Sequence, residues 1–427
     1  MVEHTGAVPK AGLRQAPFGG FYGWVVVAAV FMVTLVGFGC AYSFGSFIAV
    51  LQGEFGASRG SVSLVFSIAG CLYFGLGVVS GPMADRWGAR GVTAAGMALV
   101  ALGMVAASRA QSIGQVYWAY GIGIGLGVGL SYVPGLGAVQ RWFLKRRGFA
   151  SGLAVSGIGV GTLLVPPLAA GLIEWLGWRQ AYLVLGAGAL VLGLGAALLI
   201  ADDPHAYGTG PDGEPATPAS VTPQGLSLRE AMVTPRFIWL YAACSVAAFG
   251  IFVPFVHLVP HALDQGVPAH DAVLLLGVVG VGSTLGRFFL GALADRFGRD
   301  RFLMAMSLGV AVALALWAVS HGFWALALVA AVFGVFYGGW VAVIPAVTAE
   351  HFGGRHVGSI IGVLYTSVAL GTLLGPTAVG YAFDATHSYV WPIAISAAST
   401  ALAAALAWVS SRTVSPMAAL QHAASDA

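Results

Sequence analysis

The sequence predicts an all-α membrane protein with twelve transmembrane helices arranged as two pseudo-symmetric six-helix halves. Three observations support this fold class: few charged residues, about twelve apolar runs, and a short charged phrase that occurs once in each half. Hydrophobic residues make up 58% of the 427 and charged residues only 8%, whereas a soluble domain carries roughly a quarter charged residues. So few charges would not cover a water-facing surface, and the chain is therefore expected to lie in a membrane.

The apolar runs are long enough to cross a bilayer, which takes about 20 residues per helix. Each is expected to be a helix, because lipid offers no partner for open backbone groups. Many of the 62 glycines fall inside the runs, and small residues let membrane helices approach closely. The predicted spans lie near 22–50, 61–84, 91–109, 115–140, 148–173, 179–201, 237–262, 271–294, 302–320, 322–349, 358–383 and 389–410.

One segment, 201–235, interrupts the apolar pattern. It is rich in Pro, Gly, Ser and Thr, a composition typical of a flexible linker, and its end, 226–232, can form a short amphipathic helix on the membrane surface. The sequence therefore predicts an N-terminal half at 1–200, a linker at 201–235 and a C-terminal half at 236–427.

A charged phrase is repeated at matching places in the two halves. "GPMADRWGAR" begins at Gly81 and "GALADRFGRD" begins at Gly291, 210 positions later. Such a duplication is typical of transporters built from two repeats around a central cavity. We expect the phrases to form an inner gate, in which an acid faces a helix N-terminus and arginines bind carbonyls or a carboxylate. The predicted gating residues are Asp85, Arg86, Arg90, Asp295 and Arg296.

Basic residues indicate the orientation of the bundle. With both termini inside, 15 of the 19 Lys and Arg residues lie on the inner side and only Arg59, Arg109 and Arg179 lie in outer loops. Basic residues stay on the cytoplasmic side during insertion, so we expect a multi-pass protein of the cell's inner (plasma) membrane with both termini cytoplasmic. The net charge of +3 then reflects topology, and no nucleic-acid partner is expected.

The two phrases resemble the loop signature of the major facilitator superfamily, and the resemblance spans nearly the whole chain. Two further stretches, "FYGWVVV" (21–27) and "WFLKRRGFASGLAVSGIGVG" (142–161), are similar to signatures of the monocarboxylate transporter family and its bacterial relatives, which include the oxalate/formate exchanger. "VPFVHLVPHALDQG" (253–266) resembles the seventh span of that family.

Arg287 is the most informative single residue. It precedes Asp295 by eight residues, or about 12 Å of helix at 1.5 Å per residue, which places it near the middle of a hydrocarbon core about 30 Å thick. A mid-membrane arginine is costly and marks a substrate or ion site, and its planar fork suits a carboxylate. The alternative is a structural ion pair, but no other span offers an acid at that depth. Arg287 also matches the eighth-span arginine with which the resembled family binds the substrate carboxylate.

Two departures from the family bear on coupling and on substrate charge. Ser283 stands where mammalian members carry an aspartate one turn before the arginine, so the usual proton partner is missing. Val368 stands where the oxalate/formate exchanger carries a lysine. A single midplane cation favours a monoanion, since a dicarboxylate would leave its second charge unpaired.

Other residues at middle depth complete the predicted site. Tyr132, Tyr337 and Tyr365 can orient a carboxylate or 2-hydroxyl group, although each can equally be a packing aromatic. Ser283 is a further candidate for binding the substrate. His257, late in the seventh span and toward the outer mouth of the cavity, is a candidate for proton coupling because the unperturbed pKa of histidine is about 6.5. A histidine bonded to a backbone carbonyl beside the predicted kink at Pro254 is the alternative.

These observations predict a secondary active transporter of small monocarboxylates such as lactate or pyruvate, working by alternating access and coupled to protons. Small apolar residues of the first, fourth and fifth spans are expected to limit the size of the substrate. A carboxylate anion exchanger of the oxalate/formate type is the alternative function. No paired carboxylates or metal-spaced histidines indicate an enzyme, and no cofactor or metal is expected. The expected partners are the substrate, protons and the lipid bilayer, and the expected functional unit is a monomer.

Overall fold

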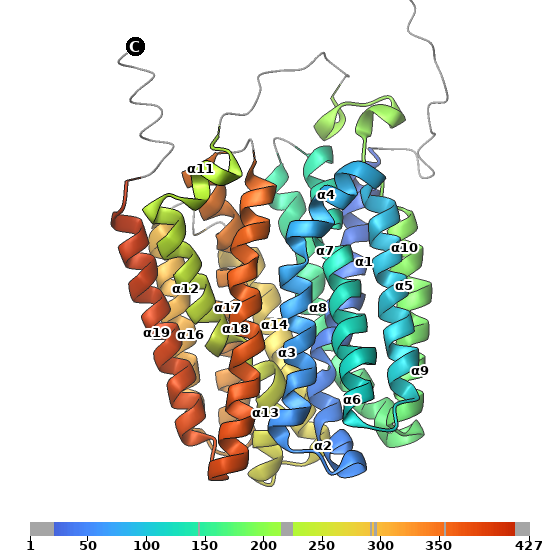
Figure 1. Cartoon of the computed structure of the whole chain (residues 1–427), viewed down its shortest axis with the longest axis vertical. Helices are drawn as coiled ribbons and strands as arrows, with labels where there is room; N and C mark the ends of the chain where they lie inside the picture. The colour runs from blue at the N-terminus through green and yellow to red at the C-terminus, as the bar shows by residue number, and fades with distance from the viewer. Residues whose placement is uncertain are drawn as a thin grey trace, which may run out of the picture.

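The computed structural model describes residues 21–143, 146–214, 225–290, 293, 297–353 and 356–414, without the side chains of residues 85, 147 and 148. Its described part is almost entirely helical, as predicted, and forms one upright bundle (Figure 1). Eleven of its helices are long and apolar enough to cross a membrane, or twelve if the bent pair Arg59–Gly75 and Gly77–Ala84 is one span. The predicted all-α membrane fold is confirmed.

The N-terminal half contains the first six spans, several of them built from consecutive helical segments. Its bounds are α1 Gly23–Tyr42 with α2 Phe44–Phe55, α3 Arg59–Gly75 with α4 Gly77–Trp87, α5 Ala89–Ser108, α6 Ile113–Val116 with η1 Tyr117–Ile122 and α7 Gly123–Trp142, α8 Arg147–Leu176, and α9 Trp178–Gly188 with η2 Ala189–Leu194 and α10 Gly195–Leu198.

The C-terminal half contains the other six spans. Its bounds are α12 Pro235–Ile251 with α13 Val253–Asp264, α14 Ala269–Leu285 with η5 Gly286–Leu290, α16 Arg299–Val319, α17 Phe323–Phe352, α18 Val357–Thr386 and α19 Val390–Arg412. The seventh span breaks between α12 and α13 at Phe252, next to Pro254, as the proline predicts.

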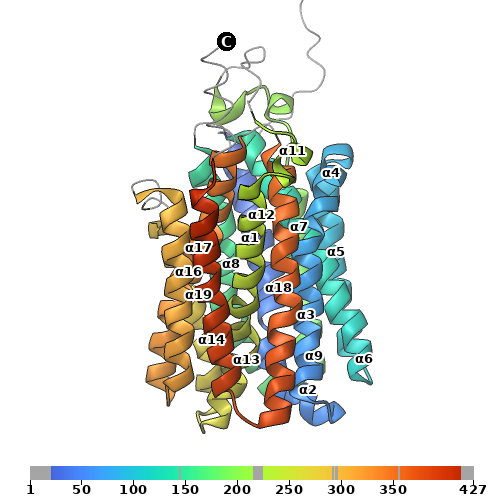
Figure 2. The same ribbon diagram turned by 60° about the vertical axis from the view of Figure 1, so that its left-hand side comes forward.

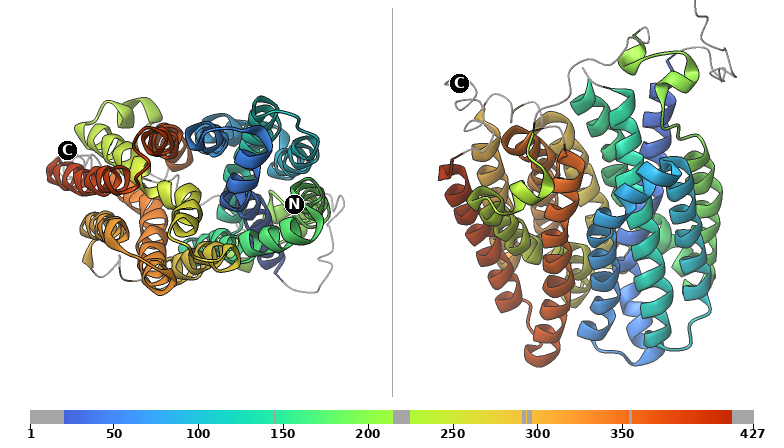
Figure 3. Two further views of the ribbon diagram at one scale, coloured as in Figure 1. Left: turned by 90° about the horizontal axis from the view of Figure 1, so that it is seen from below. Right: turned by 45° about the horizontal axis from the view of Figure 1, so that its top comes forward.

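The two halves stand side by side with their long axes roughly parallel (Figure 3). Across their interface α3 packs against α18 and α8 packs against α14, and the first of these pairs is visible in Figure 2. The start of α1, the end of α19 and the linker all lie at one end of the bundle, here called the linker end. The opposite end, with α2, α6 and α13, is called the far end.

The linker is more structured than its composition predicts. Two short 3₁₀ helices lie at Pro204–Tyr207 and Pro211–Gly213. The Tyr207 ring stacks on Tyr22 with centroids 4.3 Å apart, and the Trp142 indole donates to the Ala201 carbonyl at 2.7 Å. The expectation of a flexible linker is therefore wrong for 201–214, because aromatic residues anchor it to the N-terminal half.

The predicted amphipathic helix before α12 is present but shorter. It is α11, Leu228–Met232, and it starts at a capping box in which the Ser227 hydroxyl accepts from the Glu230 N–H and the Glu230 carboxylate accepts from the Ser227 N–H. Residues 215–224 lie outside the described part.

The second glycine of each repeated phrase adopts a backbone conformation that favours glycine. Gly88 follows α4 with φ +84°, and Gly298 precedes α16 with φ +86°. Side chains other than hydrogen strain at such angles, so both copies use glycine to turn the chain from one span into the next.

Glycines also bring α14 and η5 unusually close to α17. A Cβ added at Gly338 would lie 2.2 Å from the Ser283 carbonyl oxygen, and one added at Gly286 would lie 2.1 Å from the Val335 carbonyl oxygen. This backbone-to-backbone contact positions the segment that carries Arg287.

We expect Gly338→Ala to destabilise the protein by about 1–3 kcal/mol, the usual effect of overpacking. The added methyl group would meet the backbone of α14, which has no free rotamer to adopt. Thermal unfolding in detergent measures the effect. Gly188→Ala is the matched control, since a Cβ there meets nothing within 4 Å. Equal melting temperatures for the two variants would contradict the tight packing.

Candidate functional site

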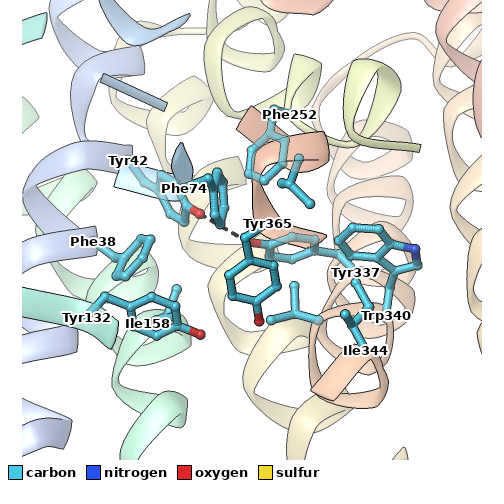
Figure 4. A pocket seen from close by; sticks show the side chains of 12 residues that line it. Phe38, Tyr42, Phe74, Tyr132, Ile158, Phe252, Tyr337, Trp340, Ile344 and Tyr365 are labelled. Carbon is cyan, nitrogen blue, oxygen red and sulfur yellow. Dashed lines mark hydrogen bonds between the residues drawn. The ribbon is translucent and has the colours of Figure 1, made fainter. Parts of the chain in front are cut away.

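A small cavity lies between the two halves (Figure 4). Five lining residues come from the first six spans and seven from the last six. They are Phe38, Tyr42, Phe74, Tyr132, Ile158, Phe252, Tyr337, Trp340, Val341, Ile344, Tyr365 and Val368. Every one of these lining residues is uncharged, and eight are aromatic. We call this space the aromatic cavity.

The cavity wall corrects one expectation. Small apolar residues of the first, fourth and fifth spans were expected to limit the substrate, but these spans instead contribute Phe38, Tyr42, Tyr132 and Ile158. The glycines of these spans are used for contacts between helices. Gly39 of α1 lies against Gly161 of α8, and Gly157 lies against the backbone of α1 at Phe31.

The structure brings the three predicted tyrosines together around the aromatic cavity. The rings of Tyr132 and Tyr365 face one another from opposite halves, nearly parallel at 17° with centroids 6.5 Å apart. The two side chains lie within reach of each other across the interface, and both line the cavity. Both rings are therefore placed to contact a ligand in the cavity.

Tyr337 has a different role, because its hydroxyl is already engaged. It lies 3.1 Å from the Tyr42 hydroxyl, so a hydrogen bond joins α17 to α1 across the cavity (Figure 4). Sequence reasoning missed Tyr42, whose ring also stacks on Phe255 of the other half with centroids 4.4 Å apart.

Arg287 is buried, with 6% of its surface exposed. Its Nη1 donates to the Ser283 hydroxyl at 2.7 Å, whereas Nε and Nη2 have no hydrogen-bond partner among the described residues. In a guanidinium group the N–H bonds of Nε and Nη2 point the same way, along one edge. The arginine therefore presents an unused pair of parallel donors, the arrangement that binds a carboxylate in bidentate fashion.

The arginine and the aromatic cavity share Tyr337. The guanidinium carbon of Arg287 lies 5.5 Å from the centroid of the Tyr337 ring, and that ring lines the cavity, whereas Arg287 and Ser283 do not. A cation over a ring face is stabilised by the ring quadrupole. The predicted binding residues thus form one connected group, in which the side chain of Tyr337 lies between the Arg287 guanidinium and the cavity.

His257 does not belong to this group. Its ring is buried, with 1% exposed, and its Nε2 lies 2.8 Å from the Pro376 carbonyl oxygen. Since a carbonyl only accepts, Nε2 carries the proton, and Nδ1 accepts from the Tyr389 hydroxyl at 3.1 Å. The backbone carbonyl that the sequence suggested as a partner belongs to α18 and not to the kink of its own span.

The Tyr389 hydroxyl connects His257 to a cluster that ties the halves together at the far end. Arg59 forms two hydrogen bonds with the Asp264 carboxylate, Nη1 at 2.6 Å and Nη2 at 2.7 Å, and donates to Tyr389 at 2.9 Å. The Asp384 carboxylate accepts from the backbone N–H groups of Arg59 and Gly60 at 3.0 and 2.8 Å. Asp384 thereby caps the N-terminus of α3 from the other half. We call Arg59, Asp264, Asp384, Tyr389 and His257 the far-end cluster.

Sequence reasoning missed the far-end cluster, although one signal was present. Arg59 is one of only three basic residues in the predicted outer loops, so it is an exception to the excess of basic residues on the inner side. The structure explains this exception, because Arg59 pairs with Asp264 of the other half.

The predicted gate at the linker end is only partly visible. Arg90 Nε donates to the Ile200 carbonyl at 2.6 Å, so it binds a carbonyl as expected, but within its own half. Arg86 is exposed. Asp295, Arg296 and the side chain of Asp85 lie outside the described residues. Asp202 accepts from the N–H of Ala89 at 2.8 Å and pairs with Arg141, so an acid from the linker occupies the N-terminus of α5.

Comparison with known proteins agrees with this architecture. The Major Facilitator Superfamily profile matches residues 29–286 and 258–424. Monocarboxylate transporter 11 of Mus musculus is 34% identical over 87% of this chain and 84% of its own length, and monocarboxylate transporter 12 of Rattus norvegicus is 30% identical over 90% and 84%. A bacterial homologue of the human lysosomal transporter Spinster, described as inward-facing and unoccupied, superposes with a TM-score of 0.72 at 16% identity, over 92% of this chain and 99% of its own. This last likeness concerns the fold alone.

We expect Arg59→Gln to loosen the far end, because it removes the bidentate pair with Asp264 and the hydrogen bond to Tyr389. Spin labels at positions 57 and 387, at the far ends of α3 and α18, should report a population with a longer distance between the labels than in the parent protein. Arg179→Gln is the matched control, because Arg179 pairs with Glu54 inside one half. A distance distribution identical to that of the control would contradict the tie.

Proposed function

Because the chain belongs to the major facilitator superfamily and, within it, to the monocarboxylate transporter family, we propose that it carries small monocarboxylates such as lactate or pyruvate by alternating access. Members of this family move solutes across a membrane and are not enzymes. The proposal adds the substrate, the coupling ion and the residues that act on each.

The unused edge of Arg287 is the observation that carries the proposal. A buried cation with a single serine partner is unfavourable, and the membrane environment adds to that cost. A monocarboxylate that accepts from Nε and Nη2 supplies both missing hydrogen bonds and the missing charge. Because both atoms are sealed in this conformation, Tyr337 or Arg287 must change rotamer when the substrate enters from the aromatic cavity.

The cavity wall supports a monoanion over a dianion. Val368, at the position of the exchanger's lysine, lines the cavity, and a second carboxylate there would be left without a cation. The exchanger function remains distinguishable by experiment. Uptake that ignores an imposed pH gradient but rises with internal formate or oxalate would favour it.

The rest of the transport cycle follows from the two ends of the bundle. We place the linker end in the cytoplasm of a cell with an inner membrane, with a functional monomer as the unit. Asp85, Arg86 and Arg90 with Asp295 and Arg296 are the proposed inner gate. The described conformation has its far end tied, which suits a state that opens toward the linker end.

Proton coupling is proposed on electrostatic grounds. A monoanion entering alone would move against the inside-negative potential, at about 2.3 kcal/mol per 100 mV, whereas one accompanying proton makes the step electroneutral. With serine at 283, His257 is the proposed carrier. Protonation would turn Nδ1 of His257 from a hydrogen-bond acceptor into a donor and would add a positive charge close to Arg59. The other titratable groups around His257 are Asp264, Asp384 and His261. Proton binding would thereby weaken the far-end cluster.

Arg287→Lys is expected to reduce lactate uptake into proteoliposomes at least tenfold while leaving the protein folded, because a point charge cannot replace the planar fork. Arg179→Lys, at an exposed ion pair, should keep parental uptake. Uptake by Arg287→Lys within twofold of the parent would remove this arginine from the site.

His257→Gln is expected to flatten the pH dependence of uptake between about pH 5 and 8, the range in which histidine titrates. Glutamine preserves a donor and an acceptor but cannot carry the proton. Initial rates at a series of external pH values, at constant membrane potential, measure the effect. A profile that matches the parent's would assign the proton to another group.

A further inference from the structure

Resting on the proposed function, we infer that the monocarboxylates preferred by this chain carry an aromatic ring, as in 3-phenyllactate or 3-phenylpyruvate. Arg287 would hold the carboxylate, and the aromatic cavity would hold the ring. This inference narrows the proposed substrates from small monocarboxylates in general to monocarboxylates with an aromatic side chain.

The composition of the wall is the first support. Eight of its twelve lining residues are aromatic and none is charged. Aromatic rings prefer offset-stacked and edge-to-face contacts with other rings at centroid distances of about 4.5–7 Å, and a methyl group cannot make them. Lactate would place one methyl group against these rings, whereas a phenyl group can make ring contacts with them.

The position of two tyrosines is the second support. Tyr132 and Tyr365 present nearly parallel rings from opposite halves, 6.5 Å apart, and Figure 4 shows both at the cavity with Phe38 and Ile158 nearby. A substrate ring that contacts both would bridge the halves. It would then be bound by two residues that move relative to each other during transport.

The test uses purified full-length protein in proteoliposomes and measures uptake of labelled lactate, 3-phenyllactate and 3-cyclohexyllactate. The last has the same carbon skeleton without aromaticity. We expect a KM for 3-phenyllactate at least tenfold below that for lactate and at least threefold below that for 3-cyclohexyllactate. Lactate uptake without any 3-phenyllactate uptake would overturn the inference and leave the proposed function standing, and equal KM values for the two ring acids would do the same. If folded protein moves none of the three acids, the proposed function itself is wrong.

Two variants locate the effect in the cavity. Tyr132→Leu and Tyr365→Leu should each raise the KM for 3-phenyllactate at least fivefold more than the KM for lactate, and a parental size-exclusion profile and circular dichroism spectrum show that each variant is folded. Trp391→Leu is the matched control, because Trp391 is 72% exposed on the outer face of the bundle and should leave the preference unchanged. A preference that survives both tyrosine variants would overturn the assignment of the ring to this wall.

Discussion

The structure depends above all on one buried positive charge. Arg287 lies inside a chain with 8% charged residues, held by a serine hydroxyl and the face of one tyrosine ring. Insertion of an arginine at the centre of a membrane helix is unfavourable by roughly 2.5–3.5 kcal/mol on translocon scales. The fold tolerates it because glycines let α14 and η5 lie against the backbone of α17, so that the side chain is enclosed by protein and not by lipid.

Besides the packing of α3 on α18 and of α8 on α14, two sets of side-chain contacts join the halves, and they differ in chemistry. At the cavity, a hydrogen bond between Tyr42 and Tyr337 and several ring contacts join the halves. At the far end, the Arg59 guanidinium pairs with Asp264, and the Arg59 backbone N–H donates to Asp384. Neutral contacts between hydroxyls and rings exchange at small cost when a ligand enters, whereas the partly exposed ion pair responds to protons and to salt. In the proposed transport cycle, substrate acts on the first set of contacts and protons act on the second.

In the proposed function, a cavity without charge beside an arginine separates two tasks. The guanidinium edge would recognise the carboxylate, and the aromatic wall would recognise the shape of the substrate. Tyr337 touches both, because its ring lies under the guanidinium and also lines the cavity. Occupation of the cavity can therefore reach the arginine through a single side chain, and changes of wall residues can alter substrate choice without altering the requirement for a carboxylate.

The sequence by itself determined the fold class, the span boundaries to within a few residues, the duplicated phrase with its turn glycines at Gly88 and Gly298, and the place of Arg287 inside the eighth span. These are local properties, since hydropathy, glycine conformation and rise per residue each depend on neighbours along the chain. Only the tertiary structure decided which side chains meet. Tyr42 and Tyr337 are 295 positions apart and Arg59 and Asp264 are 205 apart, and nothing in their local sequence distinguishes them from aromatics that face lipid or charges that face water. The same reason explains why only three tyrosines of the aromatic wall were predicted and why His257 was placed near the cavity mouth. In an apolar chain the faces of a helix have similar composition, so the residues packed against a helix in the tertiary structure decide which of its faces lines the cavity.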